Sequence, residues 1–491
     1  MTAVHGSQPR VAEDAAREPA ELVALRPGVF SATAGDGAVH LVAWPHAEAL
    51  GVLSPGQREI LRFLARGPCA QADLHALSRE RDGDGDGTDG SVGAGKLISQ
   101  LRAGGWLSVT VTYLGRGIYV LDPLRPPPPH PRTATPDLAL SRFAIVRGSR
   151  DGIVVESPRA WCDLRVLDAA ALGVIGELAG AGASTQLLPA RAAERMRRDL
   201  QWAGLAGPPD DGEGTQLRLR QWKPHELWFH ERSRLGYRGG FGDGFGGTFW
   251  AKGTFEPPTA RHDRFFASPI DLRRPDLEAL RRSDPTLTAV LEDRRSVRRH
   301  DEHNPVTVAK LGEFLYRCGR TRLVRALDGF EYASKPYPSG GSAYELELYP
   351  VVRHAQGLAP GMYHYDSLDH QLRLVQDASH PAVRRLLRVA AVGAVGGGLP
   401  QVLIVVGARV GRLMWKYESM PYALILKHVG VLYQTMYCVA TAMGIAACAL
   451  GSGDASAFTE ASGLDPLVEC SVGEFILGSC PAGEPGWAAA R

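Results

Sequence analysis

The sequence predicts a protein of the α+β class made of several units, and three observations support this prediction. The chain has 491 residues, which exceeds the size of one ordinary domain. Its hydrophobic content of 44% and charged content of 22% are typical of globular proteins. Short helical patterns followed by a hairpin fill the N-terminal part, whereas helices and strands are mixed from about residue 284 onward.

The first part of the chain has the element order of a winged helix. Residues 1–25 are expected to be a disordered tail, and residues 26–125 to form a winged-helix-like module. Three helices and a two-stranded hairpin are predicted in this order, near residues 54–64, 71–79, 96–103, 106–111 and 117–121. The third helix carries only Lys96 and Arg102 as basic residues, too few for convincing phosphate contacts. Peptide docking, or a structural role, is therefore favoured over DNA binding.

A second small unit follows a proline-rich linker at residues 126–136. Residues 138–220 are predicted to form a small α/β module that loosely repeats the first. Its strand-like segment lies near residues 143–155, and its helices near 167–178 and 190–203. We therefore expect two separate modules in the N-terminal half.

The C-terminal part is predicted to hold the largest domain. Residues 221–283 read as a connector rich in glycine and aromatic residues, residues 284–481 as the α+β domain, and residues 482–491 as a tail. Within the domain, Val429–Leu450 is almost entirely apolar and is expected to be one long helix. Its many small residues favour a helix buried in a core or subunit interface over a membrane span.

Charge and cysteine usage exclude several classes of protein. A formal net charge of +2 gives no electrostatic reason to expect nucleic acid or an anionic membrane as partner. The seven cysteines include no C-x-x-C pair, so neither a disulfide scaffold nor a metal site is expected. The polar segment at residues 1–21 lacks the apolar core of a signal peptide. We therefore expect a cytoplasmic protein.

Three apparent motifs lack the residues that their chemistry requires. Gly90–Lys96 resembles a P-loop, but Leu97 stands where a hydroxyl must contact magnesium. Gly242–Gly247 spells G-x-G-x-x-G without the strand and helix of a dinucleotide site. The acidic run that begins at Asp82 imitates a calcium loop, but Gly93 occupies the position of the bidentate glutamate.

Four other segments carry residues suited to a flat, phosphorylated cofactor and to proton transfer. Arg294–Arg299 contains four arginines and a serine, and guanidinium groups bind phosphate bidentately. Pro336–Ser342 and Ala449–Asp454 are rich in glycine, which lets a backbone approach a planar ring. Lys416 and Tyr417 are adjacent proton-transfer groups. Taken singly, each segment also reads as an ordinary turn or surface feature.

The order and spacing of these four segments resemble the nitroreductase superfamily, specifically the azoline dehydrogenases of the SagB and McbC type. The sequence segments that carry the resemblance lie between about Asp293 and Gly478. They are RRSVRR, KPYPSGGSAYELELYPVV, GMYHYDSLDH, WKYESMPYALILKHVGVLYQ and ACALGSGD. The connector sequence ELWFHERSRLGYRGG also resembles the segment that precedes the flavin domain in longer members. The resemblance covers roughly the C-terminal half of the chain.

The resemblance implies an α+β domain that binds FMN at a homodimer interface, with the long apolar helix in the dimer core. The residues that match the family's flavin contacts are Arg295, Ser296, Arg298, Pro338, Ser339, Gly340, Gly451 and Ser452. In the family, the Pro-Ser-Gly loop reaches the flavin from the partner subunit. One departure is that only Arg491 is basic after Leu477, although many relatives bind the phosphate there with a basic residue.

The resemblance also implies oxidation of thiazoline or oxazoline rings to thiazole or oxazole in a ribosomally made peptide. Lys416 and Tyr417 match the Lys-Tyr pair of the azoline dehydrogenases, and either one is a candidate for the base. The expected partners are the azoline-containing precursor peptide and a cyclodehydratase. Alternatives are an NAD(P)H-dependent nitro or quinone reductase, an oxidase of cyclic dipeptides, and a non-catalytic scaffold for the cyclodehydratase.

Overall fold

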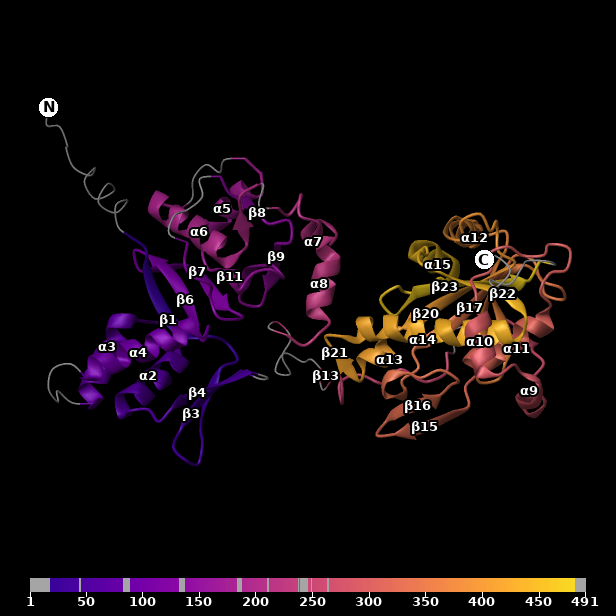
Figure 1. Ribbon diagram of the computed structural model, residues 1–491, viewed down its shortest axis with the longest axis horizontal. Coiled ribbons are helices and arrows are strands. Elements are labelled where there is room, and N and C mark those ends of the chain that lie inside the picture. The colour runs from indigo at the N-terminus through magenta and orange to yellow at the C-terminus, as the bar shows by residue number, and fades with distance from the viewer. Residues whose placement is uncertain are drawn as a thin grey trace. The chain divides into compact units, whose positions relative to one another are not determined.

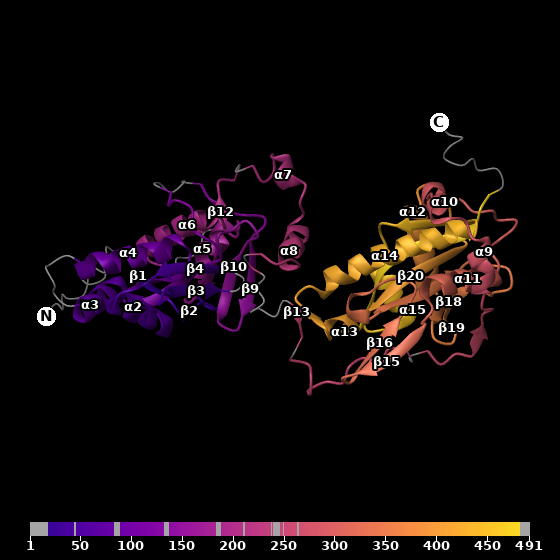
Figure 2. The same ribbon diagram turned by 60° about the horizontal axis from the view of Figure 1, so that its bottom comes forward.

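The chain forms two compact units, Met1–Phe245 and Gly246–Arg491, which are described separately (Figures 1 and 2). The computed structural model describes residues 18–481 except 44–45, 83–88, 132–136, 183–187, 210–211, 237, 239–245, 249 and 263–264. The predicted C-terminal tail, and residues 1–17 of the predicted N-terminal tail, lie outside the described residues. The calcium-like run and the G-x-G-x-x-G segment also fall largely outside them.

The N-terminal unit is built on a seven-stranded antiparallel sheet with the order β5-β1-β6-β7-β11-β10-β9. Its strands are β1 (Ala20–Leu25), β5 (Cys69–Ala70), β6 (Leu107–Tyr113), β7 (Arg116–Pro123), β9 (Ile145–Ser149), β10 (Gly152–Glu156) and β11 (Cys162–Val166). Two smaller sheets contain β2 (Phe30–Thr33), β3 (Val39–Ala43) and β4 (His46–Gly51), and β8 (Ala139–Leu140) with β12 (Ala206–Gly207).

Seven helices of this unit lie within the described residues. They are α2 (Pro55–Arg66), α3 (Gln71–Asp82), α4 (Asp89–Ala103), α5 (Ala171–Leu178), α6 (Ala190–Ala203), α7 (Leu217–Arg220) and α8 (Pro224–Arg232). Helix α2 begins next to its predicted start at residue 54, where the Ser54 side chain accepts from the Gln57 backbone amide and the Gln57 side chain accepts from the Ser54 amide. Helix α6 has the predicted bounds.

The structure corrects the predicted division of the N-terminal half. Strand β1 pairs with both β5 and β6 in the sheet, so the predicted tail at residues 1–25 is wrong from Ala20 onward. Strand β7 pairs with β11, which joins the two predicted modules through one continuous sheet. Residues of both modules also share one hydrophobic core. The helix, helix, helix, hairpin order is present, but its hairpin lies inside a larger sheet instead of forming an isolated wing.

The C-terminal unit is built on another seven-stranded antiparallel sheet, with the order β14-β19-β18-β17-β20-β23-β22. Its strands are β14 (Pro269–Asp271), β17 (Leu346–Val352), β18 (Gly361–Asp366), β19 (Gln371–Asp377), β20 (Val402–Arg409), β22 (Ile445–Leu450) and β23 (Glu469–Ser479). A hairpin is formed by β15 (Leu323–Leu327) and β16 (Phe330–Ser334), and β13 (Gly246–Gly247) pairs with β21 (Tyr417–Glu418).

Helices cover both faces of this sheet (Figures 1 and 2). The helices of the unit are α9 (Leu277–Ser283), α10 (Leu287–Asp293), α11 (Val308–Gly319), α12 (Pro381–Gly393), α13 (Val410–Met414), α14 (Pro421–Ala442) and α15 (Ala455–Ser462). Alternate residues of β20 enter two separate cores. Ile404 packs in the core with α11 and α14, and Leu403 packs in the core with α12 and α15. The unit is therefore a three-layer α/β/α sandwich.

The apolar segment Val429–Leu450 is not one helix, which corrects the prediction. Helix α14 begins at Pro421 and ends at Ala442, and Ile445–Leu450 forms strand β22. Gly444 separates them with a φ of 62°, a left-handed value that suits glycine. A fully buried strand has the same continuous apolar pattern as a buried helix, so periodicity could not locate this break.

Helix α14 alone among the described helices has the length and composition of a membrane span, with 39% of its most apolar stretch buried. A core helix of a soluble protein meets the same criteria.

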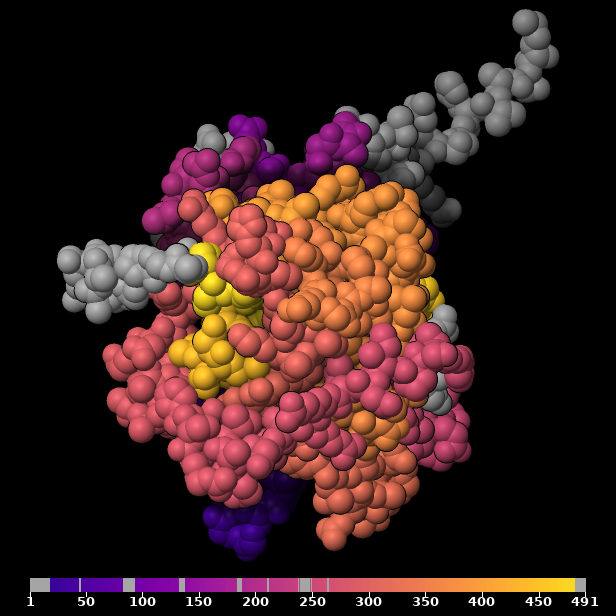
Figure 3. Space-filling model, turned by 90° about the vertical axis from the view of Figure 1, so that its right-hand side faces the viewer, coloured from indigo at the N-terminus to yellow at the C-terminus, as the bar shows by residue number. Residues whose placement is uncertain are grey.

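The predicted connector, residues 221–283, also divides between the two units. Helix α8 belongs to the first unit, where Trp228 Nε1 donates to the Phe143 carbonyl at 3.0 Å. Strand β14 and helix α9 belong to the second, which starts at Gly246 instead of residue 284. The space-filling view shows one face of this second unit, where its C-terminal residues reach the surface (Figure 3).

Candidate functional site

Helix α14 contacts three of the four segments that were predicted to carry chemistry. His428 accepts from the Gly340 amide, and Tyr437 contacts both Ser296 and the Ala449 amide. Tyr433 accepts from the amide of Glu474, which lies on β23 outside the four segments. The fourth segment, Lys416–Tyr417, lies just before the helix and leads into it through β21. The site is therefore assembled along a single helix that packs against the central sheet.

The arginine-rich segment is attached to the C-terminal half of α14. The Ser296 Oγ and Tyr437 Oη lie 2.8 Å apart, and the Ala449 amide donates to the same tyrosine oxygen at 2.8 Å. The Arg294 guanidinium lies 5.3 Å from the centre of the Tyr437 ring. Arg298 is exposed at the surface. Anchored in this way, the segment presents positive charge that suits a phosphate group.

A cavity of about 300 Å³ lies beside Gly451 and Ser452, between the end of β22, strand β23 and α14. Tyr433 and Glu474 also line it. Any side chain at Gly453 would collide with the Glu474 carboxyl group. Glycine at this position therefore keeps the wall of the cavity flat, as close approach of a planar ring requires.

The Glu474 carboxyl group, which lines this cavity, has a higher pKa than an ordinary glutamate. The residue is 7% exposed, and its backbone amide donates to Tyr433 Oη at 2.6 Å. Burial, with the nearby negative charge of Asp454, raises the pKa of Glu474 to about 7 from its ordinary value of 4.5. Near neutral pH the carboxyl group is thus partly protonated and can both donate and accept hydrogen bonds.

Replacing Glu474 with glutamine should change how stability depends on pH. Because the folded protein holds the Glu474 proton more tightly than the unfolded chain, stability falls as pH rises from about 4.5 to about 7. Glu474→Gln should therefore be more stable than the unmodified protein at pH 8, by on the order of 2 kcal/mol, and equally stable at pH 4.5. Thermal unfolding at both pH values measures this, with the exposed Glu278→Gln as control. Equal stability of both proteins at pH 8 would contradict it.

The glycine-rich loop before β17 is held by a histidine and a glutamate. The Gly340 amide donates to His428 Nε2 at 2.8 Å, and His428 Nδ1 lies 2.6 Å from Glu345 Oε1. Because Nε2 accepts a hydrogen bond, the ring proton is on Nδ1, and Nδ1 donates a hydrogen bond to the Glu345 carboxylate. Glu345 is fully buried and His428 is 5% exposed. This buried pair fixes the position of the loop.

Local hydrogen bonds complete the loop and leave its backbone strained. Ser339 Oγ accepts from the Tyr344 amide at 3.1 Å and lies 3.4 Å from Glu345 Oε2. Pro338 is exposed. Ser342 and Tyr344 have φ values of 54° and 48°, which are unfavourable for residues with a Cβ. Strained backbone that the surrounding contacts hold in place is common at functional sites.

Lys416 and Tyr417 lie against this loop. Lys416 Nζ donates to the Gly341 carbonyl at 2.9 Å. A Cβ at Gly341 would lie only 2.9 Å from Lys416 Nζ and 3.0 Å from Tyr417 Oη. The same ammonium group lies 4.3 Å from the centre of the Tyr332 ring. The structure thus brings together two predicted segments that are separated by more than 70 residues in the sequence.

The predicted site residues form two groups along α14. One group surrounds His428 and contains Ser339, Gly340, Lys416 and Tyr417, whereas the arginine segment, Gly451 and Ser452 surround Tyr433 and Tyr437. His428 and Tyr437 are nine positions apart on the helix, roughly 14 Å along the axis. Residues that the sequence prediction missed are Glu345, His428, Tyr433, Tyr437 and Glu474. Glu345, His428 and Tyr433 lie within the quoted family segments, but their roles were not predicted, because each acts through a partner distant in sequence.

Comparison with known families assigns the second unit. The nitroreductase family model matches residues 291–483. These residues form a nitroreductase-family domain. The cyanobactin oxidase ThcOx model matches residues 138–238, which end in the connector sequence that resembles the segment before the flavin domain. The superfamily inferred from the motifs is thereby confirmed.

Two relatives align with parts of the chain. A Methanocaldococcus jannaschii protein described as a nitroreductase is 27% identical over 183 residues, 37% of this chain and 84% of the relative. The trifolitoxin-processing protein TfxB of Rhizobium leguminosarum bv. trifolii is 25% identical over 165 residues. That alignment covers 33% of this chain and 44% of TfxB, less than half of the relative.

Two solved structures illustrate the structural neighbours. An Anabaena variabilis protein described as a nitroreductase has a TM-score of 0.37 and 21% identity, covering 51% of this chain and 45% of that chain. The Escherichia coli microcin synthetase McbBCD complex with truncated pro-MccB17 has a TM-score of 0.33 and 18% identity. Its coverage is 52% of this chain and 86% of that chain.

The residues of the nitroreductase-family domain fit a flavin mononucleotide, the cofactor typical of the family. The arginine segment supplies guanidinium groups for a phosphate. The cavity beside Gly451 and Ser452 offers a wall of backbone, and Gly453 leaves no side chain in it. Glu474 adds a carboxyl group that can donate or accept a hydrogen bond.

Proposed function

We propose that this protein is an FMN-dependent azoline dehydrogenase that oxidises thiazoline or oxazoline rings in a ribosomally made peptide. The observation that carries the proposal is the contact of Lys416 and Tyr417 with the Gly340–Gly341 loop inside a nitroreductase-family domain. The match of residues 138–238 to a cyanobactin oxidase and the similarity to a trifolitoxin-processing protein support a peptide substrate.

FMN would be held by Arg295, Ser296 and Arg298 at its phosphate and by the backbone at Gly451 and Ser452 beside its ring. Pro338, Ser339 and Gly340 would contact the FMN of a partner subunit. When bound, FMN supplies an acceptor for the hydride that leaves the azoline ring. A homodimer is therefore part of the proposal, and exposed apolar residues on α14, such as Tyr422 and Leu426, are suited to its interface. Sedimentation of the purified protein measures this association.

The side chains of the domain would handle the proton of the reaction. An azoline becomes aromatic by losing the Cα proton and a hydride from the neighbouring ring carbon. Lys416 or Tyr417 would accept the proton, because both side chains lie against the loop that would face the ring. The His428–Glu345 pair would keep this loop in place and thereby orient Lys416 through the Gly341 carbonyl. Molecular oxygen would restore the cofactor.

The N-terminal unit is proposed to dock the precursor peptide, and a cyclodehydratase is the proposed partner that makes the azoline. All five residues of the edge strand β9 are exposed, and an exposed edge can pair with an added strand. Because the sheet continues past residue 125, residues 1–125 are not a suitable fragment. Anisotropy of a fluorescent leader peptide with the full chain measures the docking.

The visible spectrum of the purified protein tests the proposed function. A yellow protein should lose its colour when an azoline-containing peptide is added without oxygen, and should keep it when NAD(P)H is added instead. Loss of colour with NAD(P)H alone would indicate a general nitro or quinone reductase. A colourless protein that still binds the cyclodehydratase would indicate a scaffold.

A further inference from the structure

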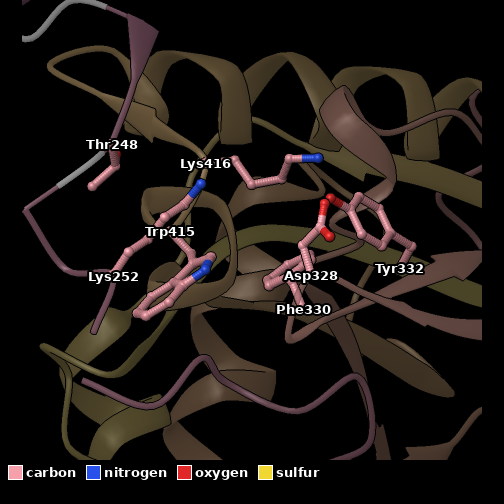
Figure 4. Close-up of a pocket in the computed structure, with 7 residues that line it drawn as sticks. All are labelled: Thr248, Lys252, Asp328, Phe330, Tyr332, Trp415 and Lys416. Carbon is pink, nitrogen blue, oxygen red and sulfur yellow. The ribbon is translucent and has the colours of Figure 1, made fainter. Parts of the chain in front are cut away.

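A small hollow with aromatic walls lies next to Lys416 (Figure 4). Its lining shares no residue with that of the cavity beside Gly451. Phe330, Tyr332 and Trp415 supply its rings, and Lys416 lies among them. Thr248, Lys252 and Asp328 complete its lining. Its volume is about 140 Å³. Because a cavity of roughly 150 Å³ holds a benzene molecule, this hollow fits one small ring but is too small for a flavin.

Three segments from different parts of the unit build the hollow. The β15–β16 hairpin brings Phe330 and Tyr332, and its two-residue turn, Asp328-Gly329, has φ values of 51° and 75°. Two positive φ values are typical of the type I′ turn that closes tight hairpins. Thr248 Oγ1 donates to the Met414 carbonyl at 2.7 Å, which attaches the start of the unit to the segment before Lys416.

A buried arginine holds the hairpin in place. Arg412 is fully buried, and its Nη2 donates to the Glu331 carbonyl at 2.6 Å. The guanidinium group also lies 4.9 Å from the centre of the Phe330 ring. Phe330 is 3% exposed, so this wall of the hollow is part of the packed core. The hollow is thus held rigidly on one side of Lys416.

We propose that this hollow is the subsite for the ring that is oxidised, with one face of the five-membered azoline ring against Trp415, its edge toward Tyr332 and Lys416, and its other face left open for the hydride acceptor. The inference rests on the proposed function and adds the position of the substrate to it. The C=N bond of an azoline, and the flat azole formed from it, pack favourably against aromatic walls, and the volume limits the occupant to one ring at a time. The adjacent lysine would then lie beside the Cα position of that ring.

Peptide binding tests the subsite independently of turnover. The probe is a fluorescein-labelled peptide that already contains a thiazole and therefore cannot be oxidised, compared with the same peptide carrying cysteine. Tyr332→Leu and Trp415→Leu should each bind the thiazole peptide about 10-fold more weakly than the unmodified protein. Tyr332→Phe keeps the ring and should keep the affinity. Leu323→Ala is the matched control, because Leu323 lies on the same hairpin and is 61% exposed.

The outcomes separate failure of the subsite from failure of the proposed function. If both leucine variants remain folded by circular dichroism and bind the thiazole peptide as tightly as the unmodified protein, the subsite is wrong. If an azoline peptide still removes the flavin colour in that case, the proposed function stands. If the unmodified protein does not distinguish the thiazole from the cysteine peptide and its colour responds only to NAD(P)H, both inferences are overturned.

Discussion

Replacing Lys416 with alanine, or Tyr417 with phenylalanine, should lower kcat for azoline oxidation by about 10²–10⁴-fold while FMN stays bound. A positioned base contributes that factor to proton abstraction, and these two side chains are proton-transfer groups that lie against Gly341. Stopped-flow measurement of flavin bleaching without oxygen isolates the chemical step. The larger loss identifies the base.

The control for this pair is Lys310→Ala, which removes an exposed lysine of the same domain. It should leave both the bleaching rate and the flavin content unchanged. A double variant of Lys416 and Tyr417 that keeps FMN and full activity would show that the base is elsewhere. A lower flavin content with an unchanged rate per bound flavin would assign the pair to cofactor binding instead.

Replacing Arg412 with methionine should cause the largest loss of stability, about 3–5 kcal/mol. Arg412 donates to three backbone carbonyls, those of Ala343, Pro258 and Glu331, at 2.6–2.8 Å. Burial, with the positive charge of Arg409, lowers the pKa of Arg412 to about 10, so the side chain stays charged at neutral pH. Its loss leaves three backbone carbonyls without a donor. They belong to Glu331 in the hairpin, Ala343 just before β17, and Pro258 in the segment before β14.

Calorimetry of the full chain measures this effect. The transition of the unit that contains Arg412 should move down by about 10 °C. Arg281→Met is the matched control, because the Arg281 side chain is 77% exposed and pairs with an exposed glutamate at 3.4 Å. That variant should change stability by less than about 0.5 kcal/mol. A transition unmoved by Arg412→Met would show that solvent satisfies these carbonyls.

Elements with clear end signals could be predicted closely from the sequence. Helix α6 has the predicted bounds, and α2 begins at Pro55, one residue after its predicted start. The β15–β16 hairpin was missed although Asp328-Gly329 is a strong signal for a two-residue turn. Strand β22 was assigned to a helix because both structures bury a continuous apolar run.

The sequence by itself determined the chemical groups of the candidate site. Each of these segments lies within a few consecutive residues: the arginine segment, the glycine-rich loops and the Lys416–Tyr417 pair. Their residue types and short spacing therefore already limit what they can bind or do. Their shared order along the chain indicated the superfamily, which the family model then confirmed.

Only the tertiary structure decided how these segments meet. Glu345 and His428 are 83 positions apart, and Ser296 and Tyr437 are 141 positions apart, so no local pattern could pair them. Likewise, the pairing of β7 with β11 joins the two predicted modules in one sheet. The sequence of the linker between them does not reveal this pairing, because it depends on where the two strands lie in the folded sheet. Side-chain chemistry is a property of single residues, whereas packing is decided between distant ones.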